Sequence, residues 1–219
     1  MSSDDYSLLN DIHSYGINVN AREIYLHSHH SDGEEAGIEF KMATTFIKNL
    51  HVLENTGSGP VLVHMHTVGG EWNDGIAIFN AIEFSPCPVM ILVYGHAVSM
   101  GSIILQAAHK RILMPDIDFM IHFGEMSVEG HSLCVESSIK VSKKSNDKML
   151  DMYSENCMHG AFFMNYSANK VKEYLRNEIN CRGDWWMDAE EAVYYGFADS
   201  VVGHKGYENL NVIRNKCLN

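Results

Sequence analysis

The stretch VMILVYGHAVSMGSIILQAAH, Val89–His109, determines the fold that the sequence predicts. Its apolar run at 89–94 is typical of a buried strand, and the segment 102–108 predicts a helix. Between them lies GHAVSMG, 95–101, in which glycines flank Ser99. A strand that passes through a tight glycine turn into a helix is the unit of parallel sheets with helical crossovers, so an α/β fold is expected.

The same order of elements occurs before this stretch. VLVHMH at 61–66 predicts a strand, Gly69 and Gly70 form the turn, and a helix with Ile76, Phe79 and Ile82 on one face follows. Further upstream, residues 22–29 predict a strand ended by a polar turn at 28–35. An amphipathic helix is expected from Ala36 to about Leu53, where apolar residues recur every three or four positions.

The C-terminal half predicts more helix. RILMPDIDFMIH at 111–122 is interpreted as one strand that ends at His122, and long helices are expected at 134–157 and 169–177. A last helix begins at Asp188, with Glu191 in the capping-box position, and stops at Gly196.

Composition limits the classes of function. The 219 residues carry a formal net charge of −12, which argues against a nucleic-acid surface because phosphate binding needs clustered Lys and Arg. The five cysteines lie at least 20 residues apart and suggest neither disulfides nor a CxxC metal site. The acidic N-terminal segment resembles no secretion signal, and no apolar run has the length of a membrane span. We therefore expect a cytoplasmic protein of one main domain, with no metal, cofactor, membrane or nucleic acid.

Three candidate functional residues lie where parallel strands end, at the edge of the sheet where such folds bind ligands. Ser99 occupies the strand-to-helix turn, and the free N–H groups of the next helix, first that of Met100, would face a nearby oxyanion. Gly70 could bring a second N–H to that point, because a residue without a side chain allows close approach. His122 could take the serine proton, although a serine in this position, taken alone, is more often only a helix cap.

Four segments in this order resemble the Clp protease proteolytic subunit family, ClpP, over roughly Arg22–Val202. They are HTVGG at 66–70, GHAVSMG at 95–101, MIH at 120–122 and GDWWMDAEEAVYYGFAD at 183–199. The resemblance implies the ClpP/crotonase fold, a spiral of repeated β-β-α units around a parallel sheet with a helical handle for ring stacking.

The resemblance also implies roles for single residues of a serine endopeptidase. Ser99 would be the nucleophile, His122 the general base and acid, and Asp184 the carboxylate that orients the histidine. The N–H groups of Gly70 and Met100 would form the oxyanion hole. Asp188 is a competing carboxylate that fits an N-cap better. The segments that would border an extended substrate contain Gly69, Glu71, Gly124 and Glu125.

At the level of the assembly, the resemblance implies a homo-oligomer of two stacked heptameric rings, a tetradecamer. Unfolded proteins would be fed into it by an AAA+ unfoldase of the ClpX, ClpA or ClpC type. Residues 1–20 would form a flexible arm, 21–205 the peptidase domain with its handle at about 123–160, and 206–219 a tail. The alternatives are a non-catalytic ring subunit, a crotonase-type acyl-CoA enzyme and a phage head-maturation peptidase on the same fold.

Overall fold

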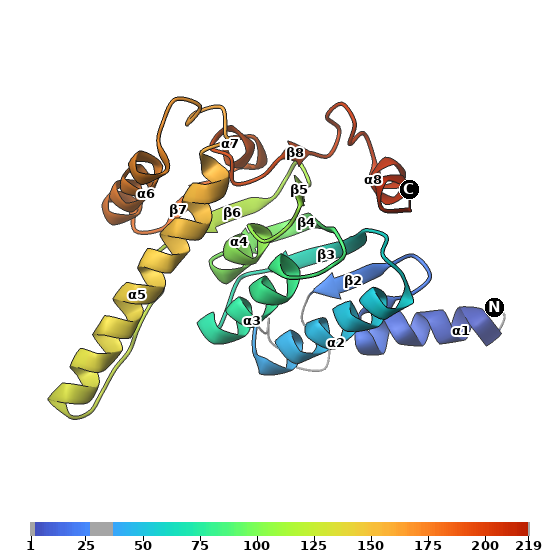
Figure 1. Ribbon diagram of the computed structural model, residues 1–219, viewed down its shortest axis with the longest axis horizontal. Coiled ribbons are helices and arrows are strands. Elements are labelled where there is room, and N and C mark those ends of the chain that lie inside the picture. Colours follow the sequence, from blue (N-terminus) through green and yellow to red (C-terminus); the bar gives the residue numbers. More distant parts are fainter. Residues whose placement is uncertain (1–2, 27–36, 219) are drawn as a thin grey trace.

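A mostly parallel β-sheet forms the centre of the protein, as seen in a computed structural model that describes residues 3–26 and 37–218 (Figure 1). The strands are β1 (Ile17–Asn18), β2 (Glu23–Leu26), β3 (Val61–Thr67), β4 (Val89–Val98), β5 (Lys110–Leu113), β6 (Asp118–Ile121), β7 (Trp185–Met187) and β8 (Ser200–Val201). Their main order is β1-β2-β3-β4-β5-β8, and β6 and β7 extend the sheet from the far end of β4. The predicted α/β class with a parallel sheet is confirmed.

Helices connect the strands and cover the sheet (Figure 1). They are α1 (Ser3–Asn10), the π-helical turn η1 (Asp11–Tyr15), α2 (Phe40–Thr56), α3 (Trp72–Glu83), α4 (Met100–Leu105), α5 (Ser132–Cys157), α6 (Ala168–Arg182), α7 (Ala189–Tyr194) and α8 (Leu210–Leu218). The predicted polar turn at 28–35 lies outside the described residues.

The two faces of the sheet have different covers, and β3 shows why its sequence is a continuous apolar run. Val61, Val63 and Met65 point into the large core that includes α2, α3 and α4. Leu62, between them, points to the other face, where a smaller cluster includes Ile213 of α8. Strands with both faces covered lose the alternation of apolar and polar residues.

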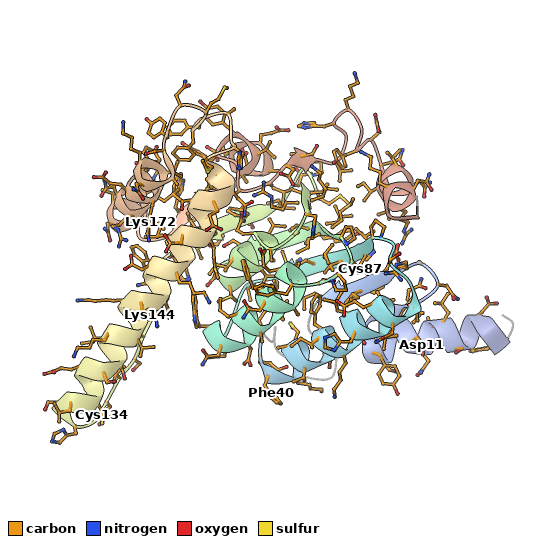
Figure 2. The ribbon with its side chains drawn as sticks, viewed as in Figure 1. Asp11, Phe40, Cys87, Cys134, Lys144 and Lys172 are labelled. Atoms are coloured by element: carbon orange, nitrogen blue, oxygen red, sulfur yellow. The ribbon has the colours of Figure 1, made fainter. Side chains whose placement is uncertain are left out.

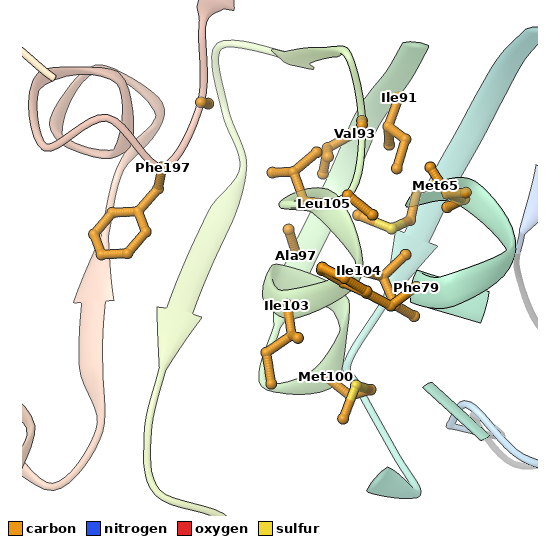
Figure 3. Packing of buried hydrophobic residues seen from close by; sticks show 14 of the residues in the cluster. Met65, Phe79, Ile91, Val93, Ala97, Met100, Ile103, Ile104, Leu105 and Phe197 are labelled. Atoms are coloured by element: carbon orange, nitrogen blue, oxygen red, sulfur yellow. The ribbon is translucent and has the colours of Figure 1, made fainter. Parts of the chain in front are cut away.

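The short helix α4 is packed on all sides by this large core. Every residue from Met100 to Leu105 is buried. Figure 3 shows Ile104 and Leu105 beside strand residues such as Val93, with Phe79 of α3 near the same helix. The start of α4 follows Ser99 directly, so the core fixes the turn that carries the serine.

The prediction of one continuous strand over 111–122 is wrong. The segment forms two strands, β5 and β6, which both lie parallel to β4 but at different ends of it. Pro115 lies between them, and a proline has no N–H to donate to a sheet ladder. The break leaves the last three residues of β4 paired with β6, so β6 runs beside the serine turn.

The projecting element is α5, whose N-terminal half extends away from the sheet (Figure 1). In Figure 2 the labelled Cys134 and Lys144 lie on this projecting half. Toward its C-terminal end Met149, Leu150 and Tyr153 are buried against the body. The helix α5 falls within the handle expected at about 123–160.

The N-terminal segment expected to form a flexible arm contains the elements α1, η1 and β1. The sequence analysis did not predict these elements.

Candidate active site

Ser99 lies at the turn between β4 and α4 in a conformation that few non-glycine residues adopt. Its φ of 53° and ψ of −120° lie outside the regions that L-residues favour. Such a residue costs on the order of 1–3 kcal/mol and persists only where its surroundings fix it. One fixing contact is the Ser99 N–H, which donates to the Met120 carbonyl at 2.9 Å.

Gly69 and Gly70 allow the turn after β3 to approach this serine. A Cβ on Gly69 would lie 2.7 Å from the Ser99 Cβ, and one on Gly70 would lie 2.3 Å from the Ile38 carbonyl oxygen. Both residues also have positive φ, at 99° and 150°. A side chain on Gly69 would push this turn away from Ser99, and one on Gly70 would push it away from Ile38. Both positions therefore require glycine for the close approach as well as for the backbone conformation.

His122 lies between the serine and a carboxylate. Its Nε2 is 2.8 Å from the Ser99 Oγ, and its Nδ1 is 3.1 Å from the Asp184 Oδ1. The imidazole is 19% exposed and the Asp184 side chain 54%, so the pair stays in contact with solvent on one side.

Strand pairing explains why Asp184 reaches the histidine across 62 residues of sequence. β6 and β7 are antiparallel, with Ile121 opposite Trp185. Continuing that register by one residue brings His122 opposite Asp184. Asp188 has a different position, because its side chain accepts the Glu191 N–H at 2.8 Å and caps α7 in a capping box. Of the two carboxylates that the sequence left open, Asp184 is therefore the one at the histidine.

Two backbone N–H groups beside Ser99 are available to a ligand. Within the described residues, neither the Gly70 nor the Met100 N–H makes a hydrogen bond. The neighbouring Gly69 carbonyl and Glu71 N–H are both bonded to Ile38, which holds the Gly70 backbone in place. Met100 is the first residue of α4, where an N–H has no partner within the helix.

A cavity of about 930 Å³ opens beside the serine. It is lined by seven of the predicted residues, namely Gly70, Glu71, Ser99, Met100, His122, Gly124 and Glu125. Gly69 does not line it and instead packs against the serine turn. The segment after His122 therefore borders the same cavity as Gly70.

The sequence analysis missed the other wall of this cavity, which α5 supplies. The missed lining residues of α5 are Ser137, Ser138, Val141, Ser142, Ser145, Asn146 and Met149, and those of other segments are Trp72, Asn73, Ile103, Met126 and Val128. The sequence did contain a signal for this wall. Three serines and a methionine, at 138, 142, 145 and 149, recur at helical spacing and form an uncharged stripe on an otherwise charged helix.

No group of three His, Cys, Asp or Glu residues that could hold a metal occurs within residues 3–26 and 37–218. None of the helices in that part of the chain has the length and apolar character needed to cross a bilayer.

Comparison with known proteins places the chain in a family. The family model named Clp protease matches residues 35–205, more than half of the sequence. The chain belongs to the Clp protease family. This membership confirms the resemblance seen in the sequence, and the fold agrees with it.

Curated relatives of the same family are similar at modest identity. The ATP-dependent Clp protease proteolytic subunit of Deinococcus radiodurans is 27% identical over 168 residues, covering 75% of this chain and 76% of the relative. Proteolytic subunit 1 of Protochlamydia amoebophila is 30% identical over 189 residues, covering 84% and 82%. Subunit 2 of Pseudomonas aeruginosa is 24% identical over 168 residues, covering 76% and 77%. The predicted Clp-type serine protease function is confirmed at the family level, and nothing in these comparisons favours the alternatives.

Proposed function

We propose that this protein hydrolyses peptide bonds with Ser99 as nucleophile, His122 as general base and acid, and Asp184 as the orienting carboxylate. The observation that carries the proposal is the unbroken contact from the Ser99 Oγ through the two nitrogens of His122 to Asp184, beside the cavity that Ser99 and His122 line. A serine hydroxyl is a weak nucleophile near neutral pH and needs a base within hydrogen-bond reach.

The reaction proceeds in two halves. His122 Nε2 accepts the Ser99 proton while the Oγ attacks the substrate carbonyl carbon, and the resulting imidazolium is stabilised by Asp184. The same nitrogen then returns the proton to the leaving amine, so the peptide bond breaks and an acyl-serine remains. Water, activated by His122, hydrolyses that ester and regenerates the free serine.

Charge on the carbonyl oxygen is stabilised by the N–H groups of Gly70 and Met100. Both are unbonded within the described residues and both belong to segments that meet at Ser99. Donors held in advance at the position of a developing oxyanion lower the barrier without reorganisation, each by about 3 kcal/mol.

The substrate is an extended segment of an unfolded polypeptide. It lies between the backbone after Gly70 and the backbone after His122, bordered by Glu71, Gly124 and Glu125. Residues 122–129 form no regular secondary structure, which leaves their N–H and C=O groups available to an added strand.

The active unit is a ring-shaped homo-oligomer, two stacked heptamers, that encloses these sites and receives its substrates from a separate AAA+ unfoldase. Support comes from the relatives, whose names describe proteolytic subunits of ATP-dependent proteases. It also comes from α5, whose exposed Leu133 and Ile139 would be covered by a second copy.

Active-site labelling tests the proposal. A fluorophosphonate should label the parent protein at Ser99, and Ser99→Ala and His122→Ala should remove the label. Asp188→Asn is the matched control and should keep it. A protein that assembles, by native mass measurement, but takes no label at Ser99 would refute the assignment.

A further inference from the structure

A buried hydrogen-bond chain connects the long helix α5 to the serine turn. The Ser102 Oγ donates to the Ser99 carbonyl oxygen at 2.6 Å, and the Tyr153 Oη lies 2.7 Å from the Ser102 Oγ. Ser102 is in α4 and Tyr153 is in α5, and both side chains are fully buried. The chain is thus closed to water.

The direction of the chain follows from counting protons. A carbonyl oxygen only accepts, so Ser102 gives its single hydroxyl proton to Ser99. Tyr153 must then be the donor to the Ser102 oxygen. Burial raises the pKa of the Tyr153 hydroxyl, which keeps that donor protonated. Phe197 packs edge-on against the Tyr153 ring at 5.4 Å and holds it in place.

The group at the end of this chain is the peptide between Ser99 and Met100. A peptide group is planar, so its carbonyl and its N–H point in fixed opposite directions. Fixing the Ser99 carbonyl therefore fixes the direction of the Met100 N–H, the proposed oxyanion donor. The backbone bonds to the same carbonyl, from the Ser102 and Ile103 N–H groups, are longer at 3.0 and 3.4 Å.

We propose that Tyr153 is a positioning residue, whose hydroxyl acts through Ser102 to aim the Met100 N–H at the oxyanion. This inference rests on the proposed function of Ser99. A second contact supports the connection between the helices, because the Asn156 Nδ2 of α5 donates to the Gln106 carbonyl just after α4. The bond from Tyr153 to Ser102 and the bond from Asn156 to Gln106 thus connect α5 to the first turn of α4 and to the residue that follows it.

Tyr153→Phe tests this role, because it removes one hydroxyl and leaves the ring. The oxyanion exists only in the transition state, so kcat for a peptide substrate should fall about tenfold while KM stays unchanged. The rate of fluorophosphonate labelling at Ser99 should fall by about the same factor, which corresponds to about 1.4 kcal/mol. Ser102→Ala should give a similar loss.

Two further variants distinguish positioning from general stability. The double variant Tyr153→Phe with Ser102→Ala should be no slower than the slower single variant, because both act through one chain. Ser154→Ala is the matched control, since it removes a buried α5 hydroxyl whose one hydrogen bond in the described part of the chain is to the nearby Asp151 carbonyl. It should leave kcat within about twofold of the parent.

The outcomes separate this inference from the proposed function. Failure of the parent protein to label at Ser99 would overturn both. If the parent labels, and the folded Tyr153→Phe and Ser102→Ala variants label at the parent rate, the positioning role alone is overturned. If Tyr153→Phe does not fold, the kcat of Ser102→Ala tests the proposal instead. A kcat equal to that of the parent protein would overturn it.

Discussion

Two histidine–carboxylate pairs lie on neighbouring parts of the same sheet and differ in nearly every property that matters for chemistry. His122 and Asp184 are 3.1 Å apart and partly exposed, and His122 lines a cavity. His64 and Glu23 are 3.5 Å apart and almost fully buried, with exposed fractions of 5% and 1%.

The remaining partners of each pair explain the difference. The second nitrogen of His122 faces the Ser99 hydroxyl at 2.8 Å, whereas that of His64 faces the Tyr94 hydroxyl at 2.9 Å. Glu23 also accepts bonds from Arg214 of α8, at 2.5 and 3.2 Å. Because Glu23 is in β2 and Arg214 is in α8, this ion pair connects the helix to the sheet. The buried pair therefore stabilises the packing of α8 on the sheet and does not activate a nucleophile.

The largest effect is expected from His122→Ala, which removes the base from the exposed pair. Activity should fall by about 10⁴-fold or more, because the serine then has no proton acceptor. Thermal unfolding should change little, since the side chain is at the surface of the cavity. His64→Gln is the contrasting variant: it should lower stability and keep kcat close to the parent value. A stable, inactive His64→Gln protein would reverse the assignment of the two pairs.

Asp184→Asn should have the next largest effect, a loss in kcat of about 10³- to 10⁴-fold. The amide cannot stabilise the imidazolium and favours the wrong tautomer of His122. The measurement is kcat across a pH series, with fluorophosphonate labelling of Ser99 slowed in parallel. Full activity in this variant would mean that the carboxylate has no part in the reaction.

The residues around Ser99 also show how much of the site could be predicted from the sequence alone. Ser99 and His122 were found because each ends a strand, which periodicity and glycines reveal. Asp184 could not be separated from Asp188, because the choice depends on β7 pairing with β6, a contact between segments about 60 residues apart. The α5 wall of the cavity and the Tyr153 chain depend on how a helix docks, which no local pattern specifies.

The buried pair is tested by Arg214→Met, which keeps most of the apolar stem. It leaves the buried Glu23 carboxylate without its guanidinium. Because Arg214 itself is 39% exposed, the cost is about 1–2 kcal/mol, less than for a fully buried pair. We expect that loss in the free energy of unfolding from denaturant titration, with kcat unchanged. The double variant with Glu23→Gln should recover part of it, and no recovery would argue against a direct pair.

Low pH should weaken the contacts of Glu23 with His64 and Arg214. Burial opposes ionisation of Glu23, but the bonds and charges of His64 and Arg214 outweigh it and lower its pKa from 4.5 to about 2. A lowered pKa contributes stability that is complete above 4.5 and is lost as the pH falls toward 2. The contribution is at most about 3 kcal/mol. The stability difference between the parent and Glu23→Gln should therefore shrink as the pH falls through this range, and a constant difference would contradict the shift.

The smallest effect is expected at Asp188, the carboxylate that competes with Asp184 in the sequence. Asp188→Ala removes the cap of α7, in which its side chain accepts the Glu191 N–H and the Glu191 side chain accepts the Asp188 N–H. Loss of such a cap costs about 1 kcal/mol of stability. Activity should stay near the parent value, because Asp188 makes no contact with His122. Measured side by side, Asp184→Asn should lose activity at nearly full stability and Asp188→Ala should lose stability at nearly full activity. A similar loss of activity in both would mean that α7, and not the Asp184 carboxylate, determines the position of His122.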